Sequence, residues 1–326
     1  MHSVKRVRTT AEAQAAKKRK EASKIIEYNA LVERVGGSRK NEEYSSTALQ
    51  LTTTLLKMNP EFYTIWNYRR EILLHIFQSL PPAEITARLD SELDFLFSRL
   101  REFPKCYWIW NHRRWCLNTS PAPDYARELK LVTMMLERDA RNFHGWQYRR
   151  GIVACLESRD DEKMKWDRSE FEYTTAKINN DFSNFSAWHN RTKLIPRLVK
   201  EDPELDAREL LKKEIYLITQ AIYTDPDDQS VWLYHRWLVT SSDIVALSIA
   251  ERTALLHQEI TSISELLAVE PDSKWCLHSL AFYKNFLADL TGQEIDKSVG
   301  EYLEKLETID PMRRKRYQDW RARISL

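Results

Sequence analysis

Two neighbouring stretches of the sequence place positively charged side chains where helices are predicted to begin. Residues 103–114 read FPKCYWIWNHRR and residues 139–150 read DARNFHGWQYRR. Lys105 and Arg141 stand at the second predicted helical position, where a cation is unfavourable, and His144 follows three residues after Arg141. Free amides of a helix N-terminus combined with cations form an anion site that suits phosphate. The residues alone leave two interpretations open, a phosphate site or surface charge that the fold tolerates.

The elements that position these residues come from an internal repeat. It recurs at residues 59–70 (NPEFYTIWNYRR), 103–114, 139–150, 181–192 (DFSNFSAWHNRT), 225–236 (DPDDQSVWLYHR) and, shortened, 270–279 (EPDSKWCLHS). The repeat tryptophans are Trp66, Trp110, Trp146, Trp188, Trp232 and Trp275. Three residues after each one the side chain is basic: Arg69, Arg113, Arg149, Arg191, His235 and His278. Positions three apart share a helix face, so this register predicts helices.

Each repeat is predicted to contain two helices. The first predicted N-caps stand seven residues before a tryptophan: Asn59, Asp139, Asp181 and Asp225. Prolines suited to a first helical position follow at Pro60, Pro104 and Pro226. The segments between copies, 48–58, 92–103, 128–139 and 212–225, carry apolar residues at spacings of three and four, which is typical of helices. The second repeat has Phe103 at the N-cap position, so its helix lacks a predicted side-chain cap.

We therefore expect an all-α protein, a right-handed superhelix (α-solenoid) of stacked antiparallel helical hairpins. The prediction is one domain over residues 1–326, with a charged helix at 9–35, six hairpins at about 41–289 and a terminal partial repeat at 295–326. The tryptophans, and the aromatic residues three positions before them, are expected to fill the seams between hairpins. The repeated arginines either pair with an acid on the next helix or face a partner.

Composition limits the possible functions. The net charge of +2 gives no general argument for nucleic-acid binding. The four cysteines are scattered without a CxxC pair, so we expect free thiols and no zinc site in this chain. No apolar run approaches the roughly 20 residues of a membrane span, and a cytoplasmic protein is expected. Basic runs in residues 1–20 and 313–316 are interpreted as solvated surface, with nuclear import or an acidic partner as the alternative.

The repeats resemble those of protein prenyltransferase α subunits, whose hallmark is an aromatic residue, then tryptophan, then arginine. The stretches NPEFYTIWNYRREIL, FPKCYWIWNHRRWCL and DARNFHGWQYRRGIV carry this resemblance, which covers the whole chain. Within that family the opening MHSVKRVRTTAEAQ and the charged helix after it are most similar to the type II, Rab-modifying branch. The chain stops after the repeats, and it therefore resembles the short fungal or protist form without immunoglobulin-like and leucine-rich domains.

The resemblance implies an enzyme subunit. In this family the α subunit wraps around a β subunit, which binds zinc and geranylgeranyl diphosphate. The type II heterodimer transfers geranylgeranyl groups to C-terminal cysteines of Rab GTPases, which an escort protein presents. This chain would then bind no cofactor by itself.

The resemblance also implies site residues. Lys105 and Tyr107 map to a lysine and a tyrosine on the diphosphate side of the active site, and Asn142 and His144 map to polar residues of the next repeat. Arg141 is added from its register alone. His2 either reaches the partner's zinc as an autoinhibitory ligand or belongs to a disordered terminus.

Two other functions remain open at this point. One is the α subunit shared by farnesyltransferase and type I geranylgeranyltransferase, which the N-terminal sequence disfavours. The other is a non-catalytic helical-repeat scaffold, which the departure of Lys105 and His144 from the repeat pattern disfavours.

Overall fold

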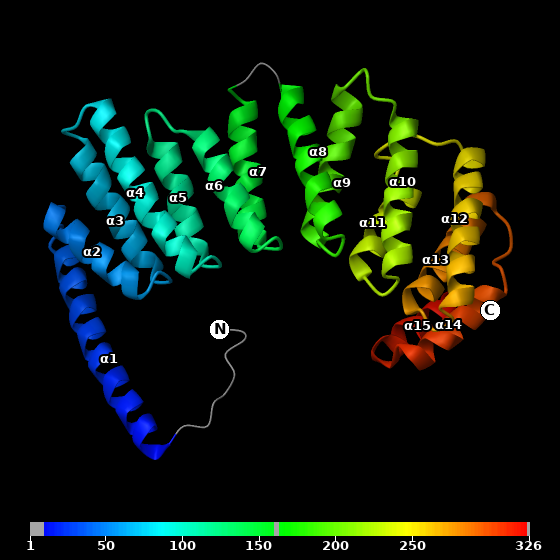
Figure 1. Cartoon of the computed structure of the whole chain (residues 1–326), viewed down its shortest axis with the longest axis horizontal. Coiled ribbons are helices and arrows are strands. Elements are labelled where there is room, and N and C mark those ends of the chain that lie inside the picture. Colours follow the sequence, from blue (N-terminus) through cyan, green and yellow to red (C-terminus); the bar gives the residue numbers. More distant parts are fainter. Residues whose placement is uncertain (1–9, 160–162, 325–326) are drawn as a thin grey trace. The chain divides into compact units, whose positions relative to one another are not determined.

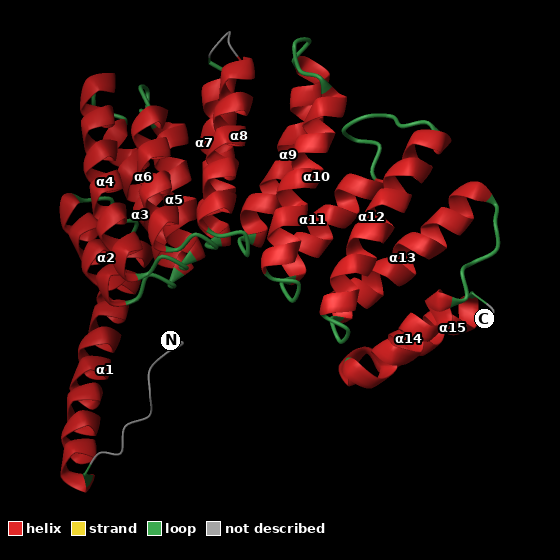
Figure 2. Ribbon diagram, turned by 45° about the vertical axis from the view of Figure 1, so that its right-hand side comes forward, coloured by secondary structure: helices red, strands yellow, loops and turns green. Residues whose placement is uncertain are grey.

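The computed structural model describes residues 10–159 and 163–324, and over these ranges it is built from helices joined by loops, with no strand (Figures 1 and 2). The first half contains α1 (Ala11–Lys40), α2 (Ser46–Met58), α3 (Tyr63–Phe77), α4 (Pro82–Glu102), α5 (Tyr107–Thr119), α6 (Tyr125–Arg138) and α7 (Phe143–Glu157). The second half contains α8 (Lys163–Asn180), α9 (Phe185–Glu201), α10 (Ala207–Thr224), α11 (Gln229–Thr240), α12 (Ile249–Val269), α13 (Lys274–Thr291), α14 (Ser298–Ile309), a short 3-10 helix (Pro311–Arg313) and α15 (Arg314–Arg323). The predicted all-α class is confirmed.

The chain divides into two compact units. One runs up to Leu136 and includes Asn142–Ile152, and the other comprises Glu137–Arg141 and the chain from Val153 onward. In the first unit α2 packs on α3, α4 packs on α5, and α3 also contacts α5. In the second unit α8 packs on α9, α10 on α11 and α12 on α13, and α11 contacts both α9 and α13. Within each unit, therefore, hairpins stack through their second helices, as the repeat predicts.

The repeated basic residues join each hairpin to the next one. Arg113, which is 1% exposed, donates from Nε and Nη2 to the two carboxylate oxygens of Glu128 on the next helix, at 2.7 and 2.6 Å. Arg69 forms the same two bonds with Glu92, and Arg191 forms them with Glu214. Such paired charge-assisted bonds compensate the desolvation of both groups. The predicted pairing with an acid on the next helix is confirmed for these arginines.

The repeat tryptophans other than Trp275 are buried, as predicted, and they also fix the turns. The indole N–H donates to a backbone carbonyl six residues upstream in four repeats: Trp66 to Pro60, Trp110 to Pro104, Trp188 to Phe182 and Trp232 to Pro226, at 2.6 to 2.9 Å. A buried indole N–H needs an acceptor, and the turn carbonyl supplies it. Each tryptophan therefore fixes the turn that precedes its own helix.

The predicted helix starts were wrong by three residues. Asn59 and Asp139 do not cap helices, because their Oδ1 atoms accept from the amides of Glu61 and Arg141 within a tight turn. The N-cap stands four residues before the tryptophan, where the side chains of Asn184 and Asp228 accept from the first helical amides. The turn intervenes because an Asx residue satisfies its bond two residues on and leaves the helix to start later.

The register of the sixth copy was also wrong. Ser273 caps α13, and four residues later stands Leu277, which is 2% exposed, in the place of the repeat tryptophan. Trp275 lies two positions earlier, half-buried, with its indole N–H donating to the carbonyl of Asp227. His278 is consequently not equivalent to the repeated arginines. The tryptophan alone does not define the register of this copy, because the N-cap stands two residues before it here and four residues before it in the other repeats.

The predicted N-terminal helix over 9–35 is longer in the structure. It continues through two glycines, Gly36 and Gly37, and ends at Lys40. Its first two turns are exposed, while Leu31 and Val35 are buried near its C-terminal end. The predicted terminal partial repeat corresponds to α14, the 3-10 helix and α15. That residues 1–326 form a single domain stays a prediction.

Candidate functional site

Lys105, Tyr107, Asn142 and His144 lie in the first unit, in the turn before α5 and at the starts of α5 and α7. Arg141 belongs to the second unit. Pro104 and Lys105 form the turn before α5, with Cys106 as the N-cap and Tyr107 as the first helical residue. Lys105 is exposed, and Tyr107 is 45% exposed. Lys105 therefore does not occupy the first turn of the helix. It lies immediately in front of the helix N-terminus, where a cation and the partial positive charge of the helix both face outward.

Hydrogen bonds between side chains and turn backbones link successive turns. Cys106 donates from Sγ to the carbonyl of Pro60 at 3.4 Å, and Asn142 donates from Nδ2 to the carbonyl of Pro104 at 3.1 Å. The Oδ1 of Asn142 accepts from the amides of His144 and Gly145 and so caps α7. Asn142 is 3% exposed and uses both ends of its amide. Its position fixes the Lys105 turn relative to the start of α7.

His144 is half-buried beside the same turn. Partial burial lowers its pKa, while a hydrogen bond to the backbone of Lys105 and the charge of Glu61 act in the opposite direction. With the lowered pKa, the imidazole is mostly neutral near pH 7. His144 therefore contributes a hydrogen bond that holds the Lys105 turn rather than a permanent positive charge.

Five rings form a continuous aromatic row across three turns of this unit. Tyr63 stacks on Trp108 at 5.1 Å between ring centroids, and Trp108 meets Tyr107 edge-on at 5.3 Å. Tyr107 lies 6.1 Å from His144, which lies 3.9 Å from Phe143. Tyr63 and Phe143 are 51% and 65% exposed. The aromatic residues three before the tryptophans are not buried in the seams as predicted, because each is the first residue of its helix. Tyr63 and Tyr107 do contact rings of the next hairpin.

The remaining predicted residues are placed as follows. Arg141 is exposed in the turn before α7, where its backbone amide donates to Asp139. His2 lies outside the described residues. Three of the four cysteines, Cys106, Cys116 and Cys276, are buried, and all four are free thiols. Burial raises the pKa of Cys106 to about 11, so its thiol stays protonated and serves as a donor.

Sequence reasoning missed two members of this surface. Glu61 occupies the register of Lys105 one repeat earlier, and its charge acts on both His144 and Cys106. Trp108 stands where other repeats have Thr64 or Ser186, and it bridges Tyr63 and Tyr107. The sequence did contain a signal for Trp108, because a tryptophan replaces a small residue at this one repeat position.

Within the described ranges, no group of three or more His, Cys, Asp or Glu side chains is placed to hold a metal ion. Across the same part of the chain, no helix is both long and apolar enough to cross a membrane.

The pattern of the protein prenyltransferase alpha subunit repeat matches residues 45–76, 89–120, 125–156, 167–198 and 211–242. Each match spans one helical hairpin of the structure, including its tryptophan and buried basic residue. The chain belongs to the family of protein prenyltransferase alpha subunits.

Similarity to individual proteins is more specific than the family match. The chain is 39% identical over 327 residues to the geranylgeranyl transferase type-2 subunit alpha of Saccharomyces cerevisiae, covering 97% of this chain and 98% of that protein. It is 42% identical to the protein of the same name from Schizosaccharomyces pombe, covering 100% and 99%. Among solved structures, Candida albicans protein geranylgeranyltransferase-I complexed with GGPP has a similar fold, with a TM-score of 0.68, 23% identity and coverage of 91% and 90%.

Proposed function

We propose that this chain is the α subunit of a type-2 geranylgeranyl transferase, a heterodimer that transfers geranylgeranyl from geranylgeranyl diphosphate to C-terminal cysteines of Rab GTPases. The observation that carries the proposal is the near full-length similarity to two yeast subunits of that name. The polar turn around Lys105 supports it. Lys105 offers an exposed positive charge at this turn, whereas a buried cation such as Arg113 is neutralised by a carboxylate.

The aromatic row is the part of this surface best suited to a β subunit. Exposed aromatic rings in contact with one another bury much apolar area at little entropic cost when a partner covers them. Tyr63, Tyr107 and Phe143 are between 45% and 65% exposed, which is unusual for rings placed so regularly. We therefore assign the turns before α3, α5 and α7 to the β-facing surface.

The role proposed for Lys105 is to stabilise the leaving group. In the transfer step the sulfur of the substrate cysteine forms a bond to C1 of the lipid, and the bond from C1 to the diphosphate oxygen breaks. Both bonding electrons leave with the diphosphate, so negative charge grows on its oxygens. Lys105 supplies a preplaced positive charge, and Tyr107, the next exposed polar side chain, supplies a hydroxyl donor.

Asn142 and His144 act in this proposal through position. The amide of Asn142 fixes the carbonyl of Pro104, and the imidazole of His144 bonds to the backbone of Lys105, so both restrict the Lys105 turn. Arg141, exposed before α7, stays a candidate from its register in the sequence alone.

Zinc belongs to the β subunit in this proposal and supplies the thiolate form of the substrate cysteine. The chain's own contribution is electrostatic and does not include a nucleophile. His2 remains a candidate ligand to the partner's zinc, with autoinhibition as its proposed effect. The escort protein and the Rab GTPase complete the proposed assembly, which we place in the cytoplasm.

Reconstitution tests this function directly. The chain is co-expressed with its candidate β subunit and assayed for lipid transfer to a Rab with a C-terminal cysteine pair, with and without an escort protein. We expect transfer only when the escort is present. Transfer to short peptides ending in a CaaX sequence without an escort would instead identify the shared subunit of farnesyltransferase and type I geranylgeranyltransferase. If a stable heterodimer showed neither activity, the remaining interpretation would be a non-catalytic helical-repeat scaffold.

A further inference from the structure

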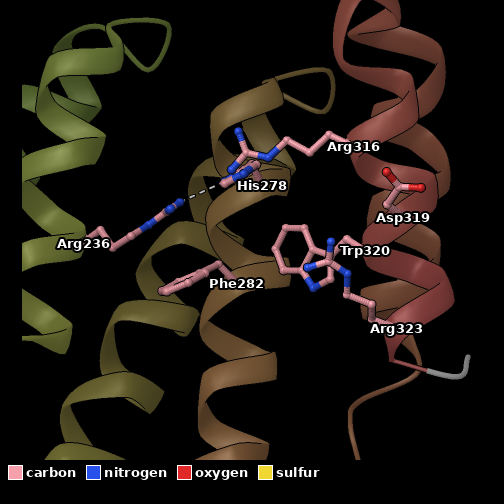
Figure 3. Close-up of a pocket in the computed structure, with 7 residues that line it drawn as sticks. All are labelled: Arg236, His278, Phe282, Arg316, Asp319, Trp320 and Arg323. Carbon is pink, nitrogen blue, oxygen red and sulfur yellow. Dashed lines mark hydrogen bonds between the residues drawn. The ribbon is translucent and has the colours of Figure 1, made fainter.

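A cationic cavity lies in the second unit, outside the surface discussed so far. It has a volume of about 420 Å³, and its lining residues are Arg236, His278, Phe282, Arg316, Asp319, Trp320 and Arg323. Arg236 comes from α11, His278 and Phe282 come from α13, and the other four come from α15 (Figure 3). Three arginines therefore share one cavity with a single carboxylate.

The carboxylate does not neutralise the arginines. Asp319 forms its ion pair with Lys315, one turn earlier on α15, at 3.1 Å. Within the described part of the chain, Arg316 and Arg323 have no hydrogen-bond or ion-pair partner. The arginines between successive hairpins behave differently, since Arg113 and Arg191 each have a carboxylate on the next helix. Like charges around one cavity repel one another unless a counter-charge enters.

Arg236 also lacks a hydrogen-bond acceptor that its counterpart in the first repeat has. Arg70 donates from Nη2 to Asn111 at 2.7 Å and from Nε to His112 at 3.1 Å. Arg236 donates from Nη2 to Nδ1 of His278, which stands in the register of Asn111, at 2.9 Å. The register of His112 holds Ser279, and the Nε of Arg236 is buried without a hydrogen-bond partner. A buried donor without an acceptor is unfavourable until an acceptor arrives.

The cavity is held in shape by the core beneath it. Tyr317, 2% exposed, packs into a cluster with Leu277, Ala281 and Leu303, and Trp320 packs against the same cluster. Arg316, Trp320 and Arg323 lie at spacings of four and three, so they share one face of α15. The guanidinium of Arg236 lies 4.1 Å from the centroid of the Phe282 ring. Phe282 thus lies against the guanidinium of Arg236, and Trp320 shares the α15 face of Arg316 and Arg323.

His278 adds a fixed donor. Because its Nδ1 accepts from Arg236, the single proton of the neutral ring is on Nε2. Burial, followed by the charges of Arg236 and Arg316, lowers the pKa of His278 to about 3, so the ring stays neutral at ordinary pH.

We propose that this cavity binds a phosphate group through Arg236, Arg316 and Arg323, and that Phe282 and Trp320 receive a flat group attached to it. Planar guanidinium groups match the oxygens of phosphate, and a doubly charged anion balances three arginines better than a single carboxylate does. Free inorganic phosphate and an aromatic phosphate ester share this chemistry. The aromatic walls favour the ester.

Isothermal titration calorimetry on the full chain at constant ionic strength tests the site, with inorganic phosphate and phenyl phosphate as probes. We expect saturable binding of both, with phenyl phosphate bound about tenfold more tightly because its ring packs against the aromatic walls. Replacing both exposed arginines, Arg316→Gln with Arg323→Gln, should weaken both probes by at least about tenfold. Phe282→Leu should reduce only the preference for the ester.

The matched control is Arg314→Gln, which removes one positive charge from α15 outside the cavity lining. It should bind both probes like the parent chain, and circular dichroism should show all variants equally helical. Absence of saturable binding, unchanged affinity in the double variant, or an equal loss in Arg314→Gln would overturn the phosphate site. Equal affinity for the two probes would overturn the role of the rings.

Discussion

The buried contact between successive hairpins and the turn at the end of a hairpin use similar residue types in opposite ways. Inside, Arg113 is 1% exposed and has both carboxylate oxygens of Glu128 as acceptors. At the end, Lys105 is exposed in front of a helix N-terminus, beside rings that are also exposed. The interior pairs recur from repeat to repeat, whereas Lys105 and Trp108 belong to one repeat. Stability is therefore assigned to the repeated positions and function to the exceptions.

The largest effect is expected from breaking an interior pair. Arg113→Met leaves the carboxylate of Glu128, which is fully buried, without its main partner, although Tyr148 still donates to it. The expected loss is about 3–5 kcal/mol of unfolding free energy, seen as a lower urea midpoint. Arg114→Met, at the exposed neighbouring position, should change stability by less than about 0.5 kcal/mol. Similar midpoints for the two variants would contradict the structural role of the pair.

A pH effect should arise at the same interior layer. His112 accepts at Nδ1 from Arg70 and lies 3.0 Å from Glu92 through Nε2, and burial lowers its pKa to about 4. The unfolded chain then binds more protons than the folded chain between about pH 6.5 and pH 4. The free energy of unfolding therefore has its full value above pH 6.5 and decreases as the pH falls. His112 alone should lower it by about 2 kcal/mol at pH 5.

Melting temperatures at pH 7 and pH 5 check this sign. His112→Asn introduces the residue found at the same register in the fourth repeat, Asn190, and removes the titrating group. The variant should show a smaller difference between the two pH values than the parent chain. An equal difference would mean that other groups, such as His278 with its lowered pKa, account for the pH dependence.

An intermediate effect is expected from the aromatic row. Trp108→Ser restores the kind of small residue that other repeats have at this position and separates Tyr63 from Tyr107. The proposed β interface should weaken by about 10- to 100-fold, with little change in the urea midpoint. Leu74→Ser, which changes another exposed apolar residue of the same unit, is the control. Equal β affinity for Trp108→Ser and the parent chain would remove the row from the interface.

The smallest effect should come from Glu61. Its carboxylate acts on His144 and opposes an anion near Lys105. Glu61→Gln removes that charge and should raise the rate of lipid transfer by up to about threefold at low salt, with less change at high salt. A slower reaction would show that Glu61 has a positive role, such as holding the Cys106 turn.

Much of the fold was predictable from the sequence because the repeat shows the same face in each copy. The spacing between Trp110 and Arg113 predicted a shared helix face, but it left open whether the arginine pairs with an acid on the next helix or faces a partner. The exposure of Tyr107 was not predictable in this way. Helical spacing tells which side of a helix a residue is on, but not that the helix begins at that residue.

The candidate site was predictable only in part. The anomaly of Lys105 was visible, because a cation occupies a register that holds an acid in the first and fifth repeats, Glu61 and Asp227. The hydrogen bonds of Asn142 and His144 to the turn of Lys105 depend on tertiary contacts that no single-repeat pattern contains. The unpaired Nε of Arg236 was hidden because the sixth copy has no tryptophan at its expected position and was aligned two residues out of register.

We propose that the Lys105 turn acts on the chemical step and not on folding. The direct test is single-turnover lipid transfer by the reconstituted heterodimer carrying Lys105→Ala, with Lys130→Ala, an exposed lysine on α6, as the control. We predict a rate constant about 10- to 100-fold lower for Lys105→Ala, with β affinity and urea midpoint unchanged. A rate constant equal to that of the Lys130→Ala control would contradict the claim.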